Sequence, residues 1–215
     1  MGMNRAKWIW LTSLGLVFAT FWIWYGGNGD PISEEEGLEM LADVERVHGV
    51  RLEDTPEGSM SRNLRAMLPY DDGKEFYAVN LETRAQGIDA LEAEARYAAI
   101  VFPLLIEYGG HPVFVSERAG LMLGKYGEGV DRVAVVRYRS LRDLLDMIAD
   151  ERMLEGNAYK TASLAHTEVF ITRPTITFVQ VRIMVGMFLA LLAIAGLAVI
   201  GRIQRRRGES AGIAV

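Results

Sequence analysis

The residue types that carry most enzyme chemistry are few in this chain and widely separated. It has no cysteine, which excludes thiolate catalysis, disulfides and cysteine metal sites. Its three histidines, His48, His111 and His166, are not spaced as metal ligands, and no serine or lysine lies in a nucleophile motif. The glycines of 124–129 do not open a helix after a strand, as a phosphate loop requires. We therefore expect no catalytic residue, no metal and no cofactor.

Three polar side chains are the best candidates for a binding site. Asn80 falls late in an apolar, β-rich run, Arg137 falls near the end of another, and Tyr97 lies in the helical segment between them. If they converge, an amide, a phenol and a guanidinium can bind a small anion. The alternative is structural. Asn80 then caps a turn, and the arginines near strand ends pair with nearby carboxylates. The arginines are Arg84, Arg118 and Arg137, and the carboxylates are Glu82, Glu117 or Asp131.

Two nearly uncharged runs stand near the ends of the chain. Residues 8–27 read WIWLTSLGLVFATFWIWYGG, and residues 183–201 read IMVGMFLALLAIAGLAVIG. A helix of roughly 18–20 residues crosses the ~30 Å apolar core of a bilayer. A cleaved signal peptide fits the first run less well, because tryptophans mark both of its ends and no small-x-small site follows. A buried core helix fits the second less well, because it is apolar on every side. We predict two transmembrane helices.

Small residues lie along one side of each predicted span. They are Gly15 and Ala19 in the first, and Gly186, Ala190 and Ala193 in the second. Small side chains let helix backbones approach closely inside a membrane. We expect these residues to mediate helix packing.

Charge predicts the orientation of both spans. Arg5 and Lys7 precede the first run, and four arginines follow the second within residues 202–207. Between them, residues 30–182 hold 27 acidic and 17 basic residues, a net charge of −10. Basic flanks stay in the cytoplasm. We expect a bacterial inner-membrane protein with both termini cytoplasmic and the main domain periplasmic. The acidic balance argues against nucleic acid as a partner.

Hydrophobic periodicity predicts an α+β domain between the spans. A helix is expected over 33–49, capped by Ser33 and ended by Gly49, followed by a loop over 50–73 with a short helix at 61–67. From residue 74 the predicted strands are 75–82, 112–117, 131–138 and 167–172. A helix is predicted at 88–108, where Pro103 should cause a kink or mark a break between two pieces. Two more are predicted, one capped by Ser140 and one near 154–164.

This βαββαβ order is that of the ferredoxin-like fold. Helices would cover one face of the sheet, yet its strands carry more apolar residues than one covered face needs. A second copy is the expected cover. The apolar strand residues are Val79, Leu81, Val113, Val133, Val135, Val169 and Ile171.

The expected organisation has seven parts. In order they are a cytoplasmic tail, a transmembrane helix, an extracytoplasmic helix and loop, the ferredoxin-like domain, a linker, a second transmembrane helix and a basic cytoplasmic tail. Their bounds are 1–7, 8–27, 28–73, 74–172, 173–182, 183–201 and 202–215.

Several segments of the middle domain carry a family resemblance. They are the strand with Val79-Asn80-Leu81, a helix ending PLLIEYGG before a PVFV strand, and DRVAVVRYRSLRDLLDMIADERM with a following LAHTEVF. On these, residues 75–172 resemble the domain of unknown function 1330 family, in the dimeric α+β barrel superfamily. The resemblance implies a barrel made by two copies and no established activity. Some members of the superfamily are monooxygenases or haem enzymes, but their catalytic motifs are not visible here.

The function expected is that of a non-catalytic accessory or interaction subunit of a membrane complex. Its partners would be the lipid bilayer and either a second copy or other membrane subunits. The alternative is a small-molecule-binding sensor, or a monooxygenase-like enzyme that uses the barrel interior. A polar, roomy cavity around Asn80 would favour that alternative.

Overall fold

The computed structural model describes residues 4–27, 29–51, 54–177 and 180–212. They form two compact units, one made of the two ends of the chain and the other of residues 27–176. The predicted boundary at residue 28 and the outermost residues of both predicted tails lie outside the described residues.

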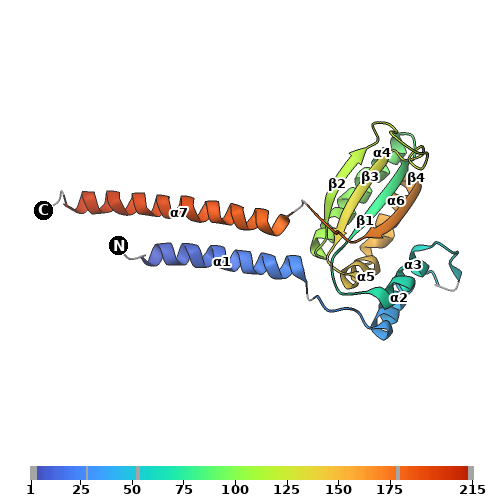
Figure 1. Cartoon of the computed structure of the whole chain (residues 1–215), viewed down its shortest axis with the longest axis horizontal. Coiled ribbons are helices and arrows are strands. Elements are labelled where there is room, and N and C mark those ends of the chain that lie inside the picture. The colour runs from blue at the N-terminus through green and yellow to red at the C-terminus, as the bar shows by residue number, and fades with distance from the viewer. Residues whose placement is uncertain (1–3, 28, 52–53, 178–179, 213–215) are drawn as a thin grey trace. The chain divides into compact units, whose positions relative to one another are not determined.

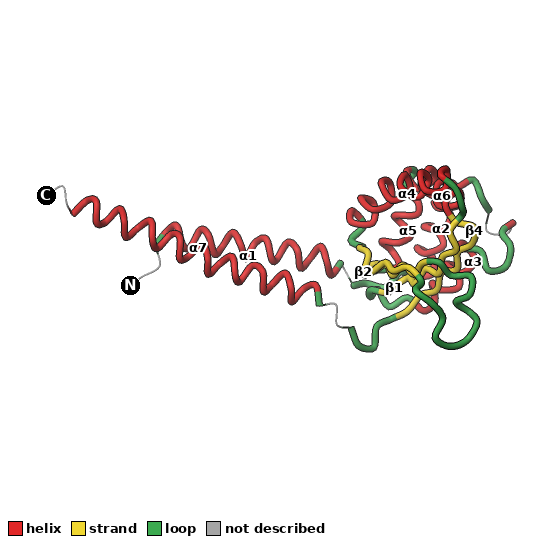
Figure 2. The backbone as a smooth tube through the Cα atoms, turned by 90° about the horizontal axis from the view of Figure 1, so that it is seen from above, coloured by secondary structure: helices red, strands yellow, loops and turns green. Residues whose placement is uncertain are grey.

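The terminal unit is a pair of apolar helices, α1 (Arg5–Gly26) and α7 (Val181–Gly212). They run antiparallel and side by side (Figures 1 and 2). Both are long and apolar enough to cross a membrane, over residues 5–26 and 181–206. The prediction of two such helices is confirmed. The second continues to Gly212 rather than ending at Gly201, because the arginines beyond position 201 are good helix formers.

The other unit contains a four-stranded antiparallel sheet, so the predicted α+β class is confirmed. Its strands are β1 (Phe76–Arg84), β2 (His111–Glu117), β3 (Arg132–Tyr138) and β4 (Leu164–Thr172). The strand order is β2-β3-β1-β4, and every neighbouring pair is antiparallel. β4 begins three residues before the predicted position 167. The early start lets Leu164 pair with Arg84 beyond a register shift at the end of β1.

Helices cover one face of this sheet. α4 (Ile88–Glu107), α5 (Leu141–Ala149) and α6 (Arg152–Ser163) lie together on one side (Figure 2). α2 (Glu34–His48) packs against α5, and α3 (Met60–Met67) follows with the 3-10 turn Leu68–Tyr70. The predicted helices agree to within a few residues. Pro103 lies inside α4 without ending it.

Local side-chain chemistry sets the helix ends. The Ser33 hydroxyl accepts a hydrogen bond from the Glu36 amide at 3.2 Å, and Ser140 caps α5 in the same way through the Asp143 amide at 3.1 Å. Gly49 ends α2 with φ 65°, a backbone conformation that glycine adopts without strain. The predicted Ser33 cap and Gly49 stop are therefore both present.

Two hydrophobic clusters hold the helices in place. One joins α2, α3, α5 and the start of β1 around Leu141 and Leu145; the other joins α4, α5 and α6 around Leu104. Leu104 and Leu145 are 0% exposed. Burying one such side chain stabilises the fold by about 1.5–3 kcal/mol. These two clusters therefore hold the helices against one face of the sheet.

Candidate functional site: the two faces of the sheet

Side chains along β1 alternate between the two faces of the sheet. The even-numbered residues from 76 to 84 point to the helices: Phe76 belongs to the α2–α5 cluster, and Glu82 lies beside α4. The odd-numbered residues point to the other side. We call the two sides the covered face and the open face. Strand register then assigns every other strand residue to one of them.

The predicted anion-binding set does not converge. Asn80 lies on the covered face between Ala134 of β3 and Val169 of β4. It is buried, and its side-chain amide donates to the Ala134 carbonyl at 3.1 Å and the Ala78 carbonyl at 3.3 Å. Arg137 is three residues along β3 from Ala134 and therefore lies on the opposite face. The sequence placed both residues on strands but did not give the strand register.

Arg137 belongs to a structural contact rather than a ligand site. It is 1% exposed. Its Nε donates to Glu75 Oε2 at 2.7 Å, and Nη1 donates to the Gly109 carbonyl at 3.0 Å. These bonds tie the end of β3 to the start of β1 and to the turn after α4. Its carboxylate partner is Glu75, which was not among the three carboxylates predicted.

A network of charges occupies the covered face where β1 ends. Arg132 Nε donates to Glu82 Oε2 at 2.6 Å, and the same guanidinium bonds Glu94 of α4. Arg84 reaches Glu117 at 2.9 Å and Glu94 at 3.5 Å. Two arginines and three glutamates therefore compensate one another across three strands and a helix. The pair of Arg84 with Glu117 was among the ion pairs that the sequence allowed. Sequence reasoning missed Arg132 and Glu94, although the alternate charged positions Glu82 and Arg84 at the end of β1 were a signal.

Tyr97 and Lys160 extend this network between α4 and α6. The Lys160 ammonium lies 6.0 Å from the centre of the Tyr97 ring. The pKa of Tyr97 is raised to about 12, first by burial and then by nearby Glu82, while Arg132 opposes the shift. Burial lowers the pKa of Lys160. In both groups desolvation disfavours the charged form.

The histidines stay apart. His48 hydrogen-bonds through Nε2 to the Ile148 carbonyl at 2.8 Å, which joins α2 to α5. His111 Nδ1 lies 3.0 Å from the Pro112 carbonyl, and His166 pairs across strands with Thr83. Among the described residues no group of three His, Cys, Asp or Glu side chains is placed to hold a metal.

The open face carries an apolar row that crosses all four strands. In register order the row is Phe114, Val135, Val79 and Phe170. Phe114 is 48% exposed and Phe170 46% exposed, while the two valines are half-buried. Leu81 and Val133 pair with each other two residues further along β1 and belong to the same face. No helix of the described domain packs on this side (Figure 2).

Some of the predicted helix-packing residues lie between α1 and α7, and others do not. Gly186 lies against Phe18, since a Cβ built there would be 3.6 Å from its ring, and Ala193 is half-buried. Gly15 has no atom within 4 Å of a built Cβ, and Ala19 and Ala190 are exposed. Helical rotation turns those residues away from the partner helix.

A glycine outside the predicted set makes the tightest approach between these helices. A Cβ at Gly196 would lie 2.2 Å from Trp10 Nε1. At the other end of the pair, the Arg182 guanidinium lies 4.5 Å from the ring centre of Trp22 and 5.3 Å from that of Tyr25. Cation–π contacts of this kind stabilise a desolvated arginine.

Comparison with known proteins gives structural likeness and no function. No protein-family model matches the chain, and no curated protein matches it significantly. Two crystal structures are similar: RPA0582, a protein of unknown function from Rhodopseudomonas palustris, and its methylated form. Each is 22% identical with a TM-score of 0.48. They cover 57% and 58% of this chain and 97% and 96% of the other.

Proposed function

We propose that this chain is a two-span inner-membrane protein that presents a ferredoxin-like domain in the periplasm. In this proposal it works as a non-catalytic accessory subunit, and its domain binds a second copy through the open face. The sheet order and the antiparallel pairing support the ferredoxin-like assignment. Two apolar helices of spanning length support the anchoring. Membership of the domain of unknown function 1330 family remains part of the same proposal.

The open face is the observation that carries the proposal. Exposed apolar patches on soluble domains mark sites where another surface binds. A flat sheet face is best covered by another sheet, packed about 10 Å away. A second copy supplies that sheet through a self-complementary, two-fold interface. Two membrane helices would hold copies in one plane, which raises their effective concentration.

The residues of the covered face argue against catalysis there. The Asn80 side-chain amide donates its hydrogen bonds to backbone carbonyls, and Arg132 forms ion pairs with glutamates. Both are tied into contacts within the domain rather than available to a reacting group. The alternative of a sensor or monooxygenase-like enzyme would need the space between two copies. The described open face is mainly apolar where that space would form.

Self-association is tested with two matched phenylalanine variants of the full chain. Phe170→Glu places a charge in the open face, whereas Phe102→Glu places one on α4, where Phe102 is 53% exposed. In mild detergent with light scattering, wild type and Phe102→Glu should be dimeric and Phe170→Glu monomeric. Equal behaviour of the two variants, or a monomeric wild type, would contradict the proposed interface.

The proposed orientation has its own test. Alkaline phosphatase is active only outside the cytoplasm, so a fusion after Gly73 should be active and a fusion after Val215 inactive. The reason is the excess of arginine beside the second helix and of acid between the two helices. The reverse pattern would overturn the topology without touching the self-association proposal.

A further inference from the structure

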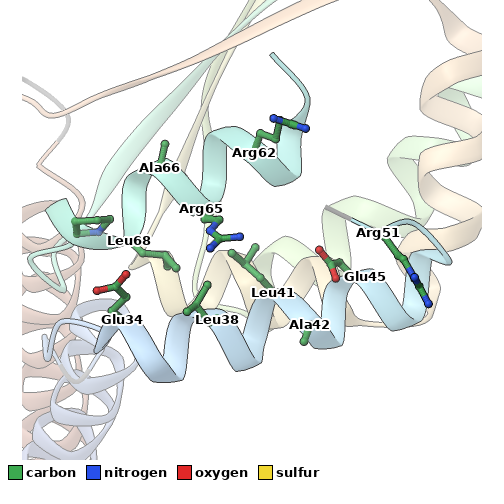
Figure 3. A pocket seen from close by; sticks show the side chains of 11 residues that line it. Glu34, Leu38, Leu41, Ala42, Glu45, Arg51, Arg62, Arg65, Ala66 and Leu68 are labelled. Atoms are coloured by element: carbon green, nitrogen blue, oxygen red, sulfur yellow. The ribbon is translucent and has the colours of Figure 1, made fainter. Parts of the chain in front are cut away.

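A groove runs between α2 and α3 (Figure 3), and its lining residues all come from positions 34–69, before β1. Its volume is about 840 Å³. Its floor is apolar and its rims are charged. The apolar residues are Leu38, Leu41, Ala42, Ala66, Leu68 and Pro69. A groove of this size and make-up accepts part of a small amphiphile, in the range usual for ligand sites.

The two rims differ in charge. Arg62 and Arg65 stand on the α3 rim, and Arg51 closes the end beyond α2, whereas Glu34 and Glu45 lie on the α2 rim. The Arg62 Nε donates to the Thr55 carbonyl at 2.6 Å, which fixes that side chain.

Arg65 is the unusual member of this set. Its guanidinium points into the space between the two helices (Figure 3). Within the described part of the chain it has no hydrogen-bond or ion-pair partner. An arginine offers five donors in a fixed fork that matches phosphate geometry.

We propose that this groove binds an anionic phospholipid of the anchoring membrane. Its phosphate would bind at the arginine end around Arg65, and part of an acyl chain would lie on the leucine floor. Charge complementarity favours an anionic headgroup, because three of the groove's five charged side chains are arginines. The domain as a whole is strongly acidic, so a general attraction to an anionic surface does not account for this cluster.

Chain connectivity favours lipid as the source of the phosphate. The inference rests on the proposed membrane anchoring and not on the proposed self-association. Only residues 27–33 join the end of α1 to α2, whose first residue, Glu34, lines the groove. Seven residues reach at most ~25 Å. The groove therefore begins within that reach of the end of a proposed membrane span, where lipid headgroups supply phosphate at high local concentration.

The absence of cysteine makes a site-specific test simple. Ala66→Cys in the full chain places a single thiol on the groove wall at an exposed position, and a fluorophore on it reports nearby spin-labelled lipid. In nanodiscs, spin-labelled phosphatidylglycerol should quench this fluorophore at least twofold more than spin-labelled phosphatidylcholine. Adding Arg65→Gln should remove the difference. The matched control is Arg46→Gln, which changes an exposed arginine of α2 that pairs with Asp43 of the same helix. This variant should keep the difference between the two lipids.

Two further arms separate the possible failures. A probe at Ile23→Cys on α1, where Ile23 is 71% exposed, reports the anchoring alone and should be quenched by both lipids. Loss of that signal would overturn the anchoring, whereas quenching at position 23 with none at position 66 would overturn the groove site only. Equal quenching by both lipids, or no effect of Arg65→Gln, would show proximity without a site. Inorganic phosphate in solution that abolishes the lipid preference would reassign the site to free anions and overturn the lipid inference.

Discussion

On the covered face of the sheet, the side chains of Arg132 and Glu82 are 12% and 6% exposed; on the open face, Phe114 and Phe170 are 48% and 46% exposed. The covered face buries a pair of opposite charges, whereas the centre of the open face leaves apolar area in water, which reverses the usual arrangement. The open face also holds one buried charge, Arg137, at its end beside the turn after α4. The buried charges of the covered face are compensated by direct ion pairs, so that face is complete within one chain. The exposed row has no such compensation. The comparison therefore assigns stability to the covered face and is consistent with the proposed association through the open one.

The largest effect we expect is on the covered face, from Arg132→Leu. Removing the guanidinium leaves Glu82 buried without a counter-charge, which costs about 3–5 kcal/mol of unfolding free energy. Urea unfolding of the full chain in detergent, followed by circular dichroism, measures the loss. Arg132→Lys keeps the charge and should lose less. A loss below about 1 kcal/mol for Arg132→Leu would mean that the network contributes little.

A core substitution should come next. Leu145→Ala removes a side chain that is 0% exposed between α5 and its neighbours. Transfer and cavity terms together cost about 3 kcal/mol in such cases. Leu123→Ala is the matched control, because Leu123 is 94% exposed in the loop before β3. Its unfolding midpoint in the same urea assay should stay unchanged. Similar losses for the two variants would contradict the assignment of the core.

Much of the fold could be predicted from local sequence pattern. Alternation and helical spacing located all four strands and the helices of the domain, and the Ser33 and Ser140 caps were readable because capping depends on nearby residues. What local pattern did not contain was register. Pairing of Asn80 with Ala134 places Arg137 on the opposite face, and a shift of one residue would reverse this.

The buried ion pairs of Arg132 could not be predicted from the sequence for a related reason. Glu82, Arg132 and Glu94 come from two strands and a helix that are distant in sequence, and each alone looks like a surface charge. Helix rotation limited the prediction for the α1–α7 pair in the same way. Small residues predicted close packing, but the register of α1 against α7 put Gly196 at the tightest contact and turned Gly15 outward. The ion pairs and the helix packing both depend on which side chains of distant segments come into contact. The sequence of one segment does not determine those contacts.

A milder open-face change sharpens the comparison. Val135→Thr keeps the shape of the side chain at the centre of the apolar row and adds a hydroxyl. We expect less than about 0.5 kcal/mol change in the unfolding of a dilute monomer, because this side chain is not part of either core. Burying an unpaired hydroxyl between two copies should weaken the dimer by about 1–2 kcal/mol, roughly 5- to 30-fold. Analytical ultracentrifugation in detergent measures the dimer constant. An unchanged constant would place Val135 outside the interface.

The smallest effect is on the alkaline stability of the covered face. Burial raises the pKa of Tyr97 to about 12 in the folded state, above the value of about 10 expected when the chain is unfolded. The neutral phenol therefore stabilises the fold fully below pH ~10. That contribution is lost between pH ~10 and ~12, because the unfolded chain releases the proton first. Tyr97→Phe removes this titration and should make the fall in unfolding free energy between pH 9 and 11 shallower, by up to about 1 kcal/mol. Tyr126→Phe, at a side chain fully exposed in the loop before β3, is the control. Its pH profile should match that of wild type. If the profile of Tyr97→Phe also matches wild type, Tyr97 is not desolvated beside Glu82, and the covered face is more open to water than its ion pairs indicate.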